Sequence, residues 1–161
     1  MTVFGTGGSS CANQSPVIDA CNEELSLNEF GALYNMYAAI DGRGICPSGW
    51  SLPDAVDWTE LLSAASSDYP QQPMSALKSE TGWAMTPDSL EGNGFDAYGF
   101  DLKPSGIRSN FYGGFAHAGT RAWFWTSGPG CRGRFATRTS ESLSSNCNNT
   151  YDGLSIRCIK D

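Results

Sequence analysis

Apolar residues recur at helical spacing in one segment of the chain, and this segment carries the clearest structural signal. The spacing is i, i+3, i+4 and i+7, which places one apolar stripe on a helix. Asp54 precedes the stripe as a good N-cap, and Asp57 suits the positive end of the helix dipole. The pattern predicts a helix over residues 55–65. The stripe consists of Trp58, Leu61, Leu62 and Ala65.

Two other early segments have weaker patterns. Pro73 is tolerated in a first helical turn and Gly82 can end a helix, so we expect a second short helix at about 73–80. Residues 30–40 mix aromatic and β-type residues with alanines. We expect a strand there, although the alanines also allow a helix.

Strand patterns dominate the second half of the chain. Residues 84–120 are expected to be mostly loop, with a short strand at Tyr98–Leu102. A β-rich run follows at 121–127, then an alternation over 132–139 that predicts a half-exposed strand with its arginines on one face. A last strand is expected at 154–159, with Leu154, Ile156 and Cys158 on one face. Early helices and late strands predict an α+β fold with a mainly antiparallel sheet.

Six cysteines stand at positions 11, 21, 46, 131, 147 and 158, and no Cys-x-x-Cys pair or Cys/His cluster occurs. An even number without such a cluster indicates a disulfide framework and an extracytoplasmic setting, with buried free thiols as the alternative. Sequence alone leaves fifteen connectivities open. The order of the cysteines suggests two local pairs, Cys11–Cys21 and Cys131–Cys147, and a long closure between Cys46 and Cys158 that contains the second of them.

The charge of the chain excludes some partners. Its net charge is −7, which disfavours binding to nucleic acid and to anionic lipid surfaces. No apolar run approaches the ~20 residues of a membrane span. Residues 1–10 have no features of a signal peptide. We therefore expect either a piece of a longer secreted or surface protein, or a complete chain that reaches an oxidising environment without secretion, as a virion component does.

Several short motifs occur in a fixed order over about residues 30–161. The motifs are Gly-Ala-Leu-Tyr-Asn-Met-Tyr-Ala-Ala (31–39), Cys-Pro-Ser-Gly-Trp-Ser-Leu-Pro (46–53), Trp58, Leu-Lys-Ser (77–79), Gly-Trp (82–83), Gly-Phe-Asp-Ala-Tyr-Gly-Phe (94–100), Trp-Phe-Trp-Thr-Ser (123–127) and Ile-Arg-Cys-Ile-Lys-Asp (156–161). Together they resemble a known family, the Fibrobacter succinogenes major paralogous domain. The resemblance implies a C-type-lectin-like fold, related to the formylglycine-generating enzyme and to the variable proteins of diversity-generating retroelements. It also implies nested long and short disulfides, which agrees with the pairing above.

The resemblance also indicates how the chain is organised and where it acts. Its members are secreted or surface proteins of bacteria, often lipoproteins, and some phage structural proteins, and no enzymatic activity is established for them. Residues 1–28 depart from the family pattern. We therefore expect an irregular lead-in at 1–28 and a C-type-lectin-like domain at 29–161.

Catalytic chemistry finds little support in the sequence. His117 is the only histidine, and its neighbours show no nucleophile signature, so no catalytic residues and no enzyme activity are expected. An oxidase like the formylglycine-generating enzyme would need a redox-active cysteine pair, whereas each cysteine here has a structural partner.

A cofactor is not expected, but calcium is possible. Acidic and amide side chains in one glycine-rich loop could offer oxygen ligands, although ordinary loop acids are the simpler interpretation. The calcium candidates are Asp88, Asn93 and Asp96, with Glu91 and Asp101 nearby.

A binding surface on the late strands and loops is the leading hypothesis. Arg and Tyr favour binding surfaces, and Asn and Arg can hydrogen-bond sugar hydroxyls. We expect a non-catalytic module that recognises a glycan or protein at a cell or virion surface; the alternative is a phage structural protein. Tyr112 and Trp123 should be exposed, whereas Trp50, Trp58, Phe124 and Trp125 should be core. The candidate ligand-binding residues are Tyr112, Arg121, Trp123, Arg132, Arg134, Arg138, Asn146, Asn148, Asn149 and Tyr151.

Overall fold

The computed structural model describes residues 3–4, 23–85, 91–111 and 114–161. Its helices are α1 (Glu23–Phe30), α2 (Met36–Ala39) and α3 (Ala55–Asp68). Its strands are β1 (Val3–Phe4), β2 (Leu33–Tyr34), β3 (Trp50–Ser51), β4 (Ile107–Ser109), β5 (Gly114–Ala116), β6 (Arg121–Trp125), β7 (Gly133–Thr137), β8 (Ser144–Asn146) and β9 (Ile159–Lys160).

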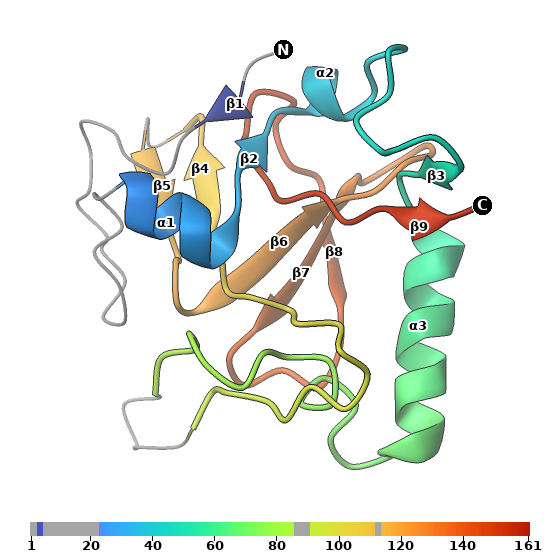
Figure 1. Ribbon diagram of the computed structural model, residues 1–161, viewed down its shortest axis with the longest axis vertical. Helices are drawn as coiled ribbons and strands as arrows, with labels where there is room; N and C mark the ends of the chain where they lie inside the picture. Colours follow the sequence, from blue (N-terminus) through green and yellow to red (C-terminus); the bar gives the residue numbers. More distant parts are fainter. Residues whose placement is uncertain (1–2, 5–22, 86–90, 112–113) are drawn as a thin grey trace.

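A three-stranded antiparallel sheet, β6-β7-β8, forms the centre of the fold. Two-stranded antiparallel pairs surround it: β1 with β2, β3 with β9, and β4 with β5. In Figure 1, α3 stands on one side of the central sheet, while α1 and the β4–β5 pair lie on the other. The predicted α+β class is confirmed, and the strands form several small antiparallel sheets in place of one larger sheet. No helix among the described residues is long and apolar enough to cross a membrane.

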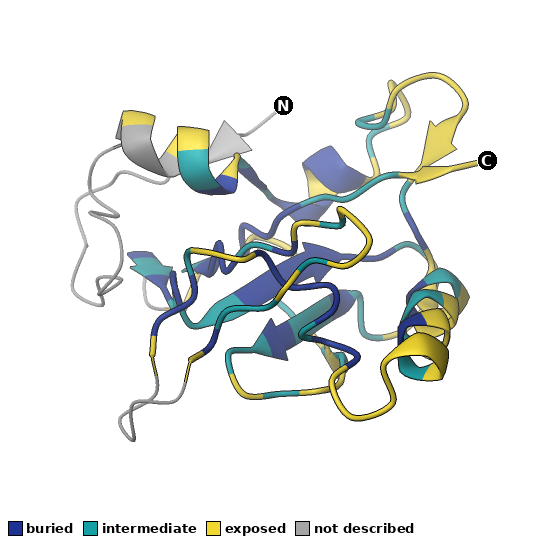
Figure 2. Ribbon diagram, turned by 60° about the horizontal axis from the view of Figure 1, so that its bottom comes forward, coloured by how far each residue is buried: buried dark blue, intermediate teal, exposed yellow. Residues whose placement is uncertain are grey.

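Strand β6 is buried on both faces and contributes side chains to two hydrophobic core clusters, one on each face. Ala122 and Phe124 pack into one cluster with Trp58 of α3. Trp123 and Trp125 point to the opposite face and pack into the other cluster. Figure 2 shows this strand in the colour of buried residues across most of its length. Alternating side chains of one strand therefore join two halves of the interior.

The predicted core positions are mostly confirmed. Trp58, Phe124 and Trp125 are buried. Trp50 was expected in the core, but it is 45% exposed, because β3 pairs only with β9 at the edge of the molecule. Trp123 was expected on the surface, but only 6% of it is exposed. The double-sided burial of β6 explains this second error.

Helix α3 forms where the sequence predicts it and extends three residues further, to Asp68. The Asp54 carboxylate accepts hydrogen bonds from the backbone N–H groups of Val56 and Asp57. In return, Oδ2 of Asp57 accepts from the backbone N–H of Asp54 at 2.7 Å, which completes a capping box. The helix ends at Asp68, two residues before Pro70, which cannot continue it.

The second predicted helix, at 73–80, is wrong; this segment forms a series of turns. Two of the backbone groups that a continuous helix would use are bonded elsewhere. Leu102 donates its backbone N–H to the carbonyl of Leu77 at 3.0 Å, and its carbonyl accepts from the N–H of Ser79 at 3.1 Å. The strand predicted at Tyr98–Leu102 is also absent, because a turn closes between Asp96 and Gly99 and only Leu102 makes a bridge.

Residues 30–40 do not form the expected continuous strand. Helix α1 reaches Phe30, Gly31 follows with a φ of 75°, β2 covers two residues, and α2 begins at Met36. The Asn35 side chain caps α2 by accepting from the N–H of Ala38 at 2.9 Å. Helix α1 begins at Glu23, so the end of the segment expected to be irregular is helical.

The predicted strands of the second half are largely confirmed. β6 and β7 occupy the runs predicted at 121–127 and 132–139. The last predicted strand is instead divided: Leu154 bridges Tyr34, Ser155 bridges Phe124, and only Ile159–Lys160 forms a strand, paired with β3. The β4–β5 pair lies inside the stretch expected to be mostly loop.

Two disulfides staple this arrangement. Cys46–Cys158 closes a sequence separation of 112 residues, and Cys131–Cys147 closes one of 16. Both predicted pairs are confirmed, and they are typical of proteins that meet an oxidising environment. Cys11 and Cys21 lie outside the described residues.

Candidate binding surface

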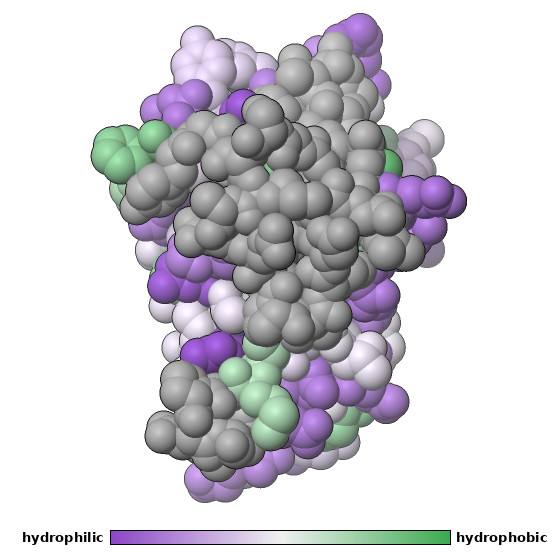
Figure 3. All heavy atoms as spheres, turned by 90° about the vertical axis from the view of Figure 1, so that its left-hand side faces the viewer, coloured by the Kyte–Doolittle hydropathy of each residue, from purple (hydrophilic) through white to green (hydrophobic). Residues whose placement is uncertain are grey.

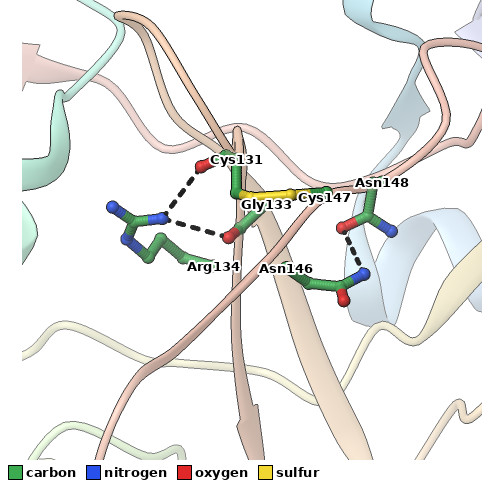
Figure 4. The surroundings of a disulfide bond; sticks show 6 residues. All are labelled: Cys131, Gly133, Arg134, Asn146, Cys147 and Asn148. Carbon is green, nitrogen blue, oxygen red and sulfur yellow. Dashed lines mark hydrogen bonds between the residues drawn. A yellow bond between two sulfur atoms is a disulfide. The ribbon is translucent and has the colours of Figure 1, made fainter.

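The Cys131–Cys147 disulfide lies at the centre of the segment that the sequence predicts to bind a ligand. Cys131 precedes β7 and Cys147 follows β8, so the bond ties neighbouring antiparallel strands where Gly133 pairs with Asn146. Figure 4 shows different side chains on its two flanks. Arg134 lies on one flank and donates from Nη1 to the carbonyls of Cys131 and Gly133. Asn146 and Asn148 lie on the other.

The asparagine flank is a hydrogen-bonded network rather than a set of free ligand contacts. Asn146 donates from Nδ2 to Oδ1 of Asn148 at 3.1 Å, and Asn148 donates from Nδ2 to Oδ2 of Asp152 at 3.3 Å. Asp152 is 7% exposed and also accepts from the backbone N–H groups of Asn149 and Asn110. Asn146 and Asn148 therefore use their amides to hold the loop after Cys147.

The loop that this network holds places Tyr151 beside Tyr37 of α2 on the surface. The carbonyl of Asn149 accepts from the N–H of Asp152, and Oδ1 of Asn149 accepts from the N–H of Tyr151. The loop is also tied to α2, because Met36 donates its N–H to the carbonyl of Thr150 at 3.0 Å. The rings of Tyr37 and Tyr151 are 5.4 Å apart at an angle of 51°.

We call Tyr37, Asn149, Thr150 and Tyr151 the tyrosine face. Both rings are about half exposed, Tyr37 at 54% and Tyr151 at 53%. Hydrogen bonds from the side chains of Thr150 and Tyr151 lower the pKa of Tyr37, because they stabilise its phenolate. The pKa of Tyr151 is raised, because its hydroxyl is the partner that gives the proton to this bond. Tyr151 is thus the donor and Tyr37 the acceptor in this pair.

The tyrosine face combines apolar and polar groups at fixed positions. Each ring offers an apolar surface and a hydroxyl at its edge. Asn149 is exposed, and its Nδ2 group has no partner among the described residues. Such a surface can stack against the C–H groups of a ligand ring and exchange hydrogen bonds with its hydroxyls.

The predicted arginines do not gather into one patch. Arg134 lines a groove of about 350 Å³ against α3 and Leu143. Arg138 instead donates from Nη1 to the carbonyl of Met85 at 3.1 Å, and fully buried Ala136 lies between the two along β7. Arg121 stands over the ring of Phe135 at 5.9 Å. Arg132 is partly exposed next to Cys131.

Two predicted aromatic contacts have different outcomes. Trp123 is buried and stacks on Phe135, with ring centroids 4.5 Å apart and an interplanar angle of 23°. Since β6 is covered on both faces, Trp123 has no exposed surface for stacking on a ligand. Tyr112 lies outside the described residues.

The calcium candidates are occupied by structural hydrogen bonds where the structure describes them. Asn93 accepts through Oδ1 from the N–H of Trp83, and Asp96 accepts through Oδ1 from the N–H of Asp101. Asp88 lies outside the described residues. In the described part of the chain, no three His, Cys, Asp or Glu side chains gather as a metal site would require.

Tyr37 is the residue that sequence reasoning missed. It lies on the helix α2, in which Met36, Ala38 and Ala39 are buried, so Tyr37 is the residue of this short helix that points outward. The alanines of residues 30–40 also allowed a helix, and this alternative was the signal that could have revealed Tyr37 as a surface residue. The side of the molecule that carries α1 and β5 is different in character: the coloured atoms in Figure 3 are mostly hydrophilic, with small separate hydrophobic patches.

The fold and the surface together define a disulfide-stapled α+β domain that presents a pair of aromatic side chains on its surface. The chain belongs to the Fibrobacter succinogenes major domain family, whose sequence profile matches residues 6–160. The match includes most of the segment 1–28. No curated protein and no solved structure matches the chain.

Proposed function

We propose that this protein is a non-catalytic recognition module that binds a glycan through its tyrosine face. The observation that carries the proposal is the exposed pair Tyr37 and Tyr151, held 5.4 Å apart by contacts that do not involve a ligand. Preorganised aromatic residues bind with less loss of conformational entropy than mobile ones. Neighbouring hydroxyl and amide groups supply the hydrogen bonds that sugar hydroxyls need.

We further propose a C-type-lectin-like fold and a place at the bacterial cell surface. Three features support the fold: a loop-rich second half, a late antiparallel sheet, and a chain end that returns to pair with β2 and β3. The two disulfides support an oxidising location. A virion protein would share all these features, and mass spectrometry of purified phage particles tests that alternative.

An array of glycans and bacterial surface proteins tests the proposed function. The wild-type domain should bind a set of glycans, and Tyr37→Ala and Tyr151→Ala should each weaken that binding at least about tenfold, as expected for truncation of a central aromatic contact. Trp50→Ala is the matched control, because it removes an exposed aromatic ring that lies outside the tyrosine face.

Two results would contradict the proposal. Glycan binding that survives both tyrosine substitutions would place the site elsewhere on the domain. Binding only to proteins on the array would reject a glycan as the ligand. Circular dichroism of each variant ensures that a loss of binding reflects the surface and not unfolding.

A further inference from the structure

A groove lies between α3 and the β3–β9 pair, and it shares no lining residue with the tyrosine face. It has a volume of about 220 Å³. In Figure 1, β3 and β9 sit beside the first turn of α3 and close to the C-terminus, and Figure 2 shows this strand pair as exposed. Most of the groove is apolar, and its apolar lining includes Trp50, Trp58, Leu61, Phe100 and Ile159.

The aromatic walls of this groove are firmly placed. Trp58 is 4% exposed, and its ring meets Phe100 edge-on at 6.3 Å. The backbone N–H of Trp50 donates to the carbonyl of Pro47 at 3.0 Å, and the backbone of Trp50 pairs with that of Lys160 across the strands. The Cys46–Cys158 disulfide holds the two segments together beside it. The groove therefore exists before any ligand arrives.

Trp50 is exposed in a way that favours a binding role. Large apolar side chains that remain on the surface in a group often mark ligand sites. Trp50 is 45% exposed and Ile159 is 36% exposed, and both line this groove. The β3–β9 pair thus displays an indole ring next to a preformed apolar hollow.

The lining carries two cations, Arg157 and Lys160, and one carboxylate, although the chain as a whole carries −7. Arg157 stacks over Phe100 at 4.6 Å, and its Nη2 donates to the backbone carbonyl of that residue. Lys160 is exposed and forms no ion pair in the described part of the chain. The one carboxylate in the lining, that of Asp57, is engaged by the N-cap of α3.

We propose that this groove binds a small aromatic carboxylate. The volume suits one aromatic ring with a short chain, since pockets for larger ligands start at about 300 Å³. The ring would lie among Trp50, Trp58 and Phe100. The carboxylate would lie at the rim, where the ammonium of Lys160 and the guanidinium of Arg157 attract it. This site is independent of the proposed glycan function.

An NMR titration of the ¹⁵N-labelled domain with N-acetyl-L-phenylalanine tests this site. The indole signal of Trp50, assigned by its loss in Trp50→Phe, should shift as the probe binds. The neutral amide of the same compound should bind more weakly. Trp50→Ala should raise the Kd about tenfold or more, because it removes one aromatic wall. Lys160→Gln should raise it about threefold through loss of the charge contact.

Tyr37→Ala is the matched control, because Tyr37 is an exposed aromatic residue of the tyrosine face. This substitution should leave the Kd for N-acetyl-L-phenylalanine unchanged. If Trp50→Ala fails to fold, Lys160→Gln and the amide comparison still decide the question. The proposal is overturned if the amide binds as tightly as the acid, or if the probe leaves the signal of Trp50 unchanged. A peptide ending in phenylalanine that binds more than tenfold tighter would also overturn it, in favour of a protein terminus as the occupant.

Discussion

Asn148 occupies the space that a side chain on Gly133 would need. A Cβ atom at Gly133 would lie 2.1 Å from Oδ1 of Asn148 and 2.9 Å from the carbonyl oxygen of Asn146. Contacts this short require the loop after Cys147 to move. Because that loop carries Tyr151, the glycine links the central sheet to the tyrosine face.

Gly133→Ala should therefore destabilise the domain by about 1–3 kcal/mol, the usual cost of overpacking a closely packed site. Urea denaturation followed by tryptophan fluorescence measures this change. Gly42→Ala is the control, since no atom lies within 4 Å of a Cβ at that position. Equal stability of the two variants would show that the loop around Asn148 yields without cost.

The two disulfides should contribute differently to stability and to ligand binding. On the loop-entropy model, the 112-residue separation of Cys46–Cys158 contributes about 5 kcal/mol to the free energy of unfolding. The 16-residue separation of Cys131–Cys147 contributes about 3 kcal/mol. The short disulfide nevertheless holds the strand end from which the tyrosine face projects.

Replacing both cysteines of each pair with serine tests this separation by denaturation and by glycan binding. The Cys46/Cys158 variant should lose more stability. Under conditions where both variants remain folded, the Cys131/Cys147 variant should lose more affinity. The opposite order in affinity would mean that the Asp152 network alone fixes the loop.

Local signals in the sequence were sufficient to predict α3, β6 and β7. The capping box of α3 lies within four residues, and its apolar stripe needs only one packing partner. The run that became β6 contains Trp123, Phe124 and Trp125, whose β propensity is high whichever face is buried. For the same reason, the sequence could not show that Trp123 is buried, because burial on the second face depends on Phe135 and the far core cluster.

Non-local contacts explain the elements that sequence reasoning missed. Residues 73–80 have the composition of a helix, but the backbone of Leu102 takes the hydrogen-bonding groups of Leu77 and Ser79. Local sequence patterns also could not predict the tyrosine face, for the same reason. Asn149 and Tyr151 are recognisable as surface residues, but their partner Tyr37 comes from the opposite half of the chain. A pattern within a short window cannot reveal a pairing of that kind.

Lys78 is a buried cation whose removal should change the pH dependence of stability. It is 1% exposed, and Nζ donates to the carbonyls of Arg138 and Ser140. Burial lowers the pKa of Lys78 from its ordinary value of 10.5. Between the lowered value and 10.5, the unfolded chain binds more protons at this residue than the folded one does. Stability should therefore rise with pH across that window.

Lys78→Met removes this titration and leaves two carbonyls without a donor, which should cost about 1–3 kcal/mol at neutral pH. Urea denaturation at several pH values between 7 and 10.5 gives both effects. The difference in stability between wild type and variant should widen as the pH rises. Parallel pH profiles would show that the lysine keeps its ordinary pKa despite burial.

The hydrogen bonding between Tyr37 and Tyr151 should be visible in the ionisation of the tyrosines. The pKa of Tyr37 is lowered by the hydroxyls of Thr150 and Tyr151, whereas the pKa of Tyr151 is raised by its bond to Tyr37. Ultraviolet absorbance during an alkaline titration follows phenolate formation directly. One tyrosine should ionise below the ordinary value of about 10, and its partner above it.

Tyr37→Phe should remove the early ionisation and return Tyr151 toward its ordinary pKa, because its acceptor is gone. Tyr151→Phe should raise the pKa of Tyr37, but not fully, since Thr150 still donates to it. Tyr37 is the acceptor if Tyr37→Phe returns the pKa of Tyr151 toward its ordinary value while Tyr151→Phe raises the pKa of Tyr37 only in part. If each substitution removed one ordinary ionisation and left the other tyrosine unchanged, the hydroxyls would not be coupled in solution. The tyrosine face would then offer a ligand two independent rings in place of one fixed pair.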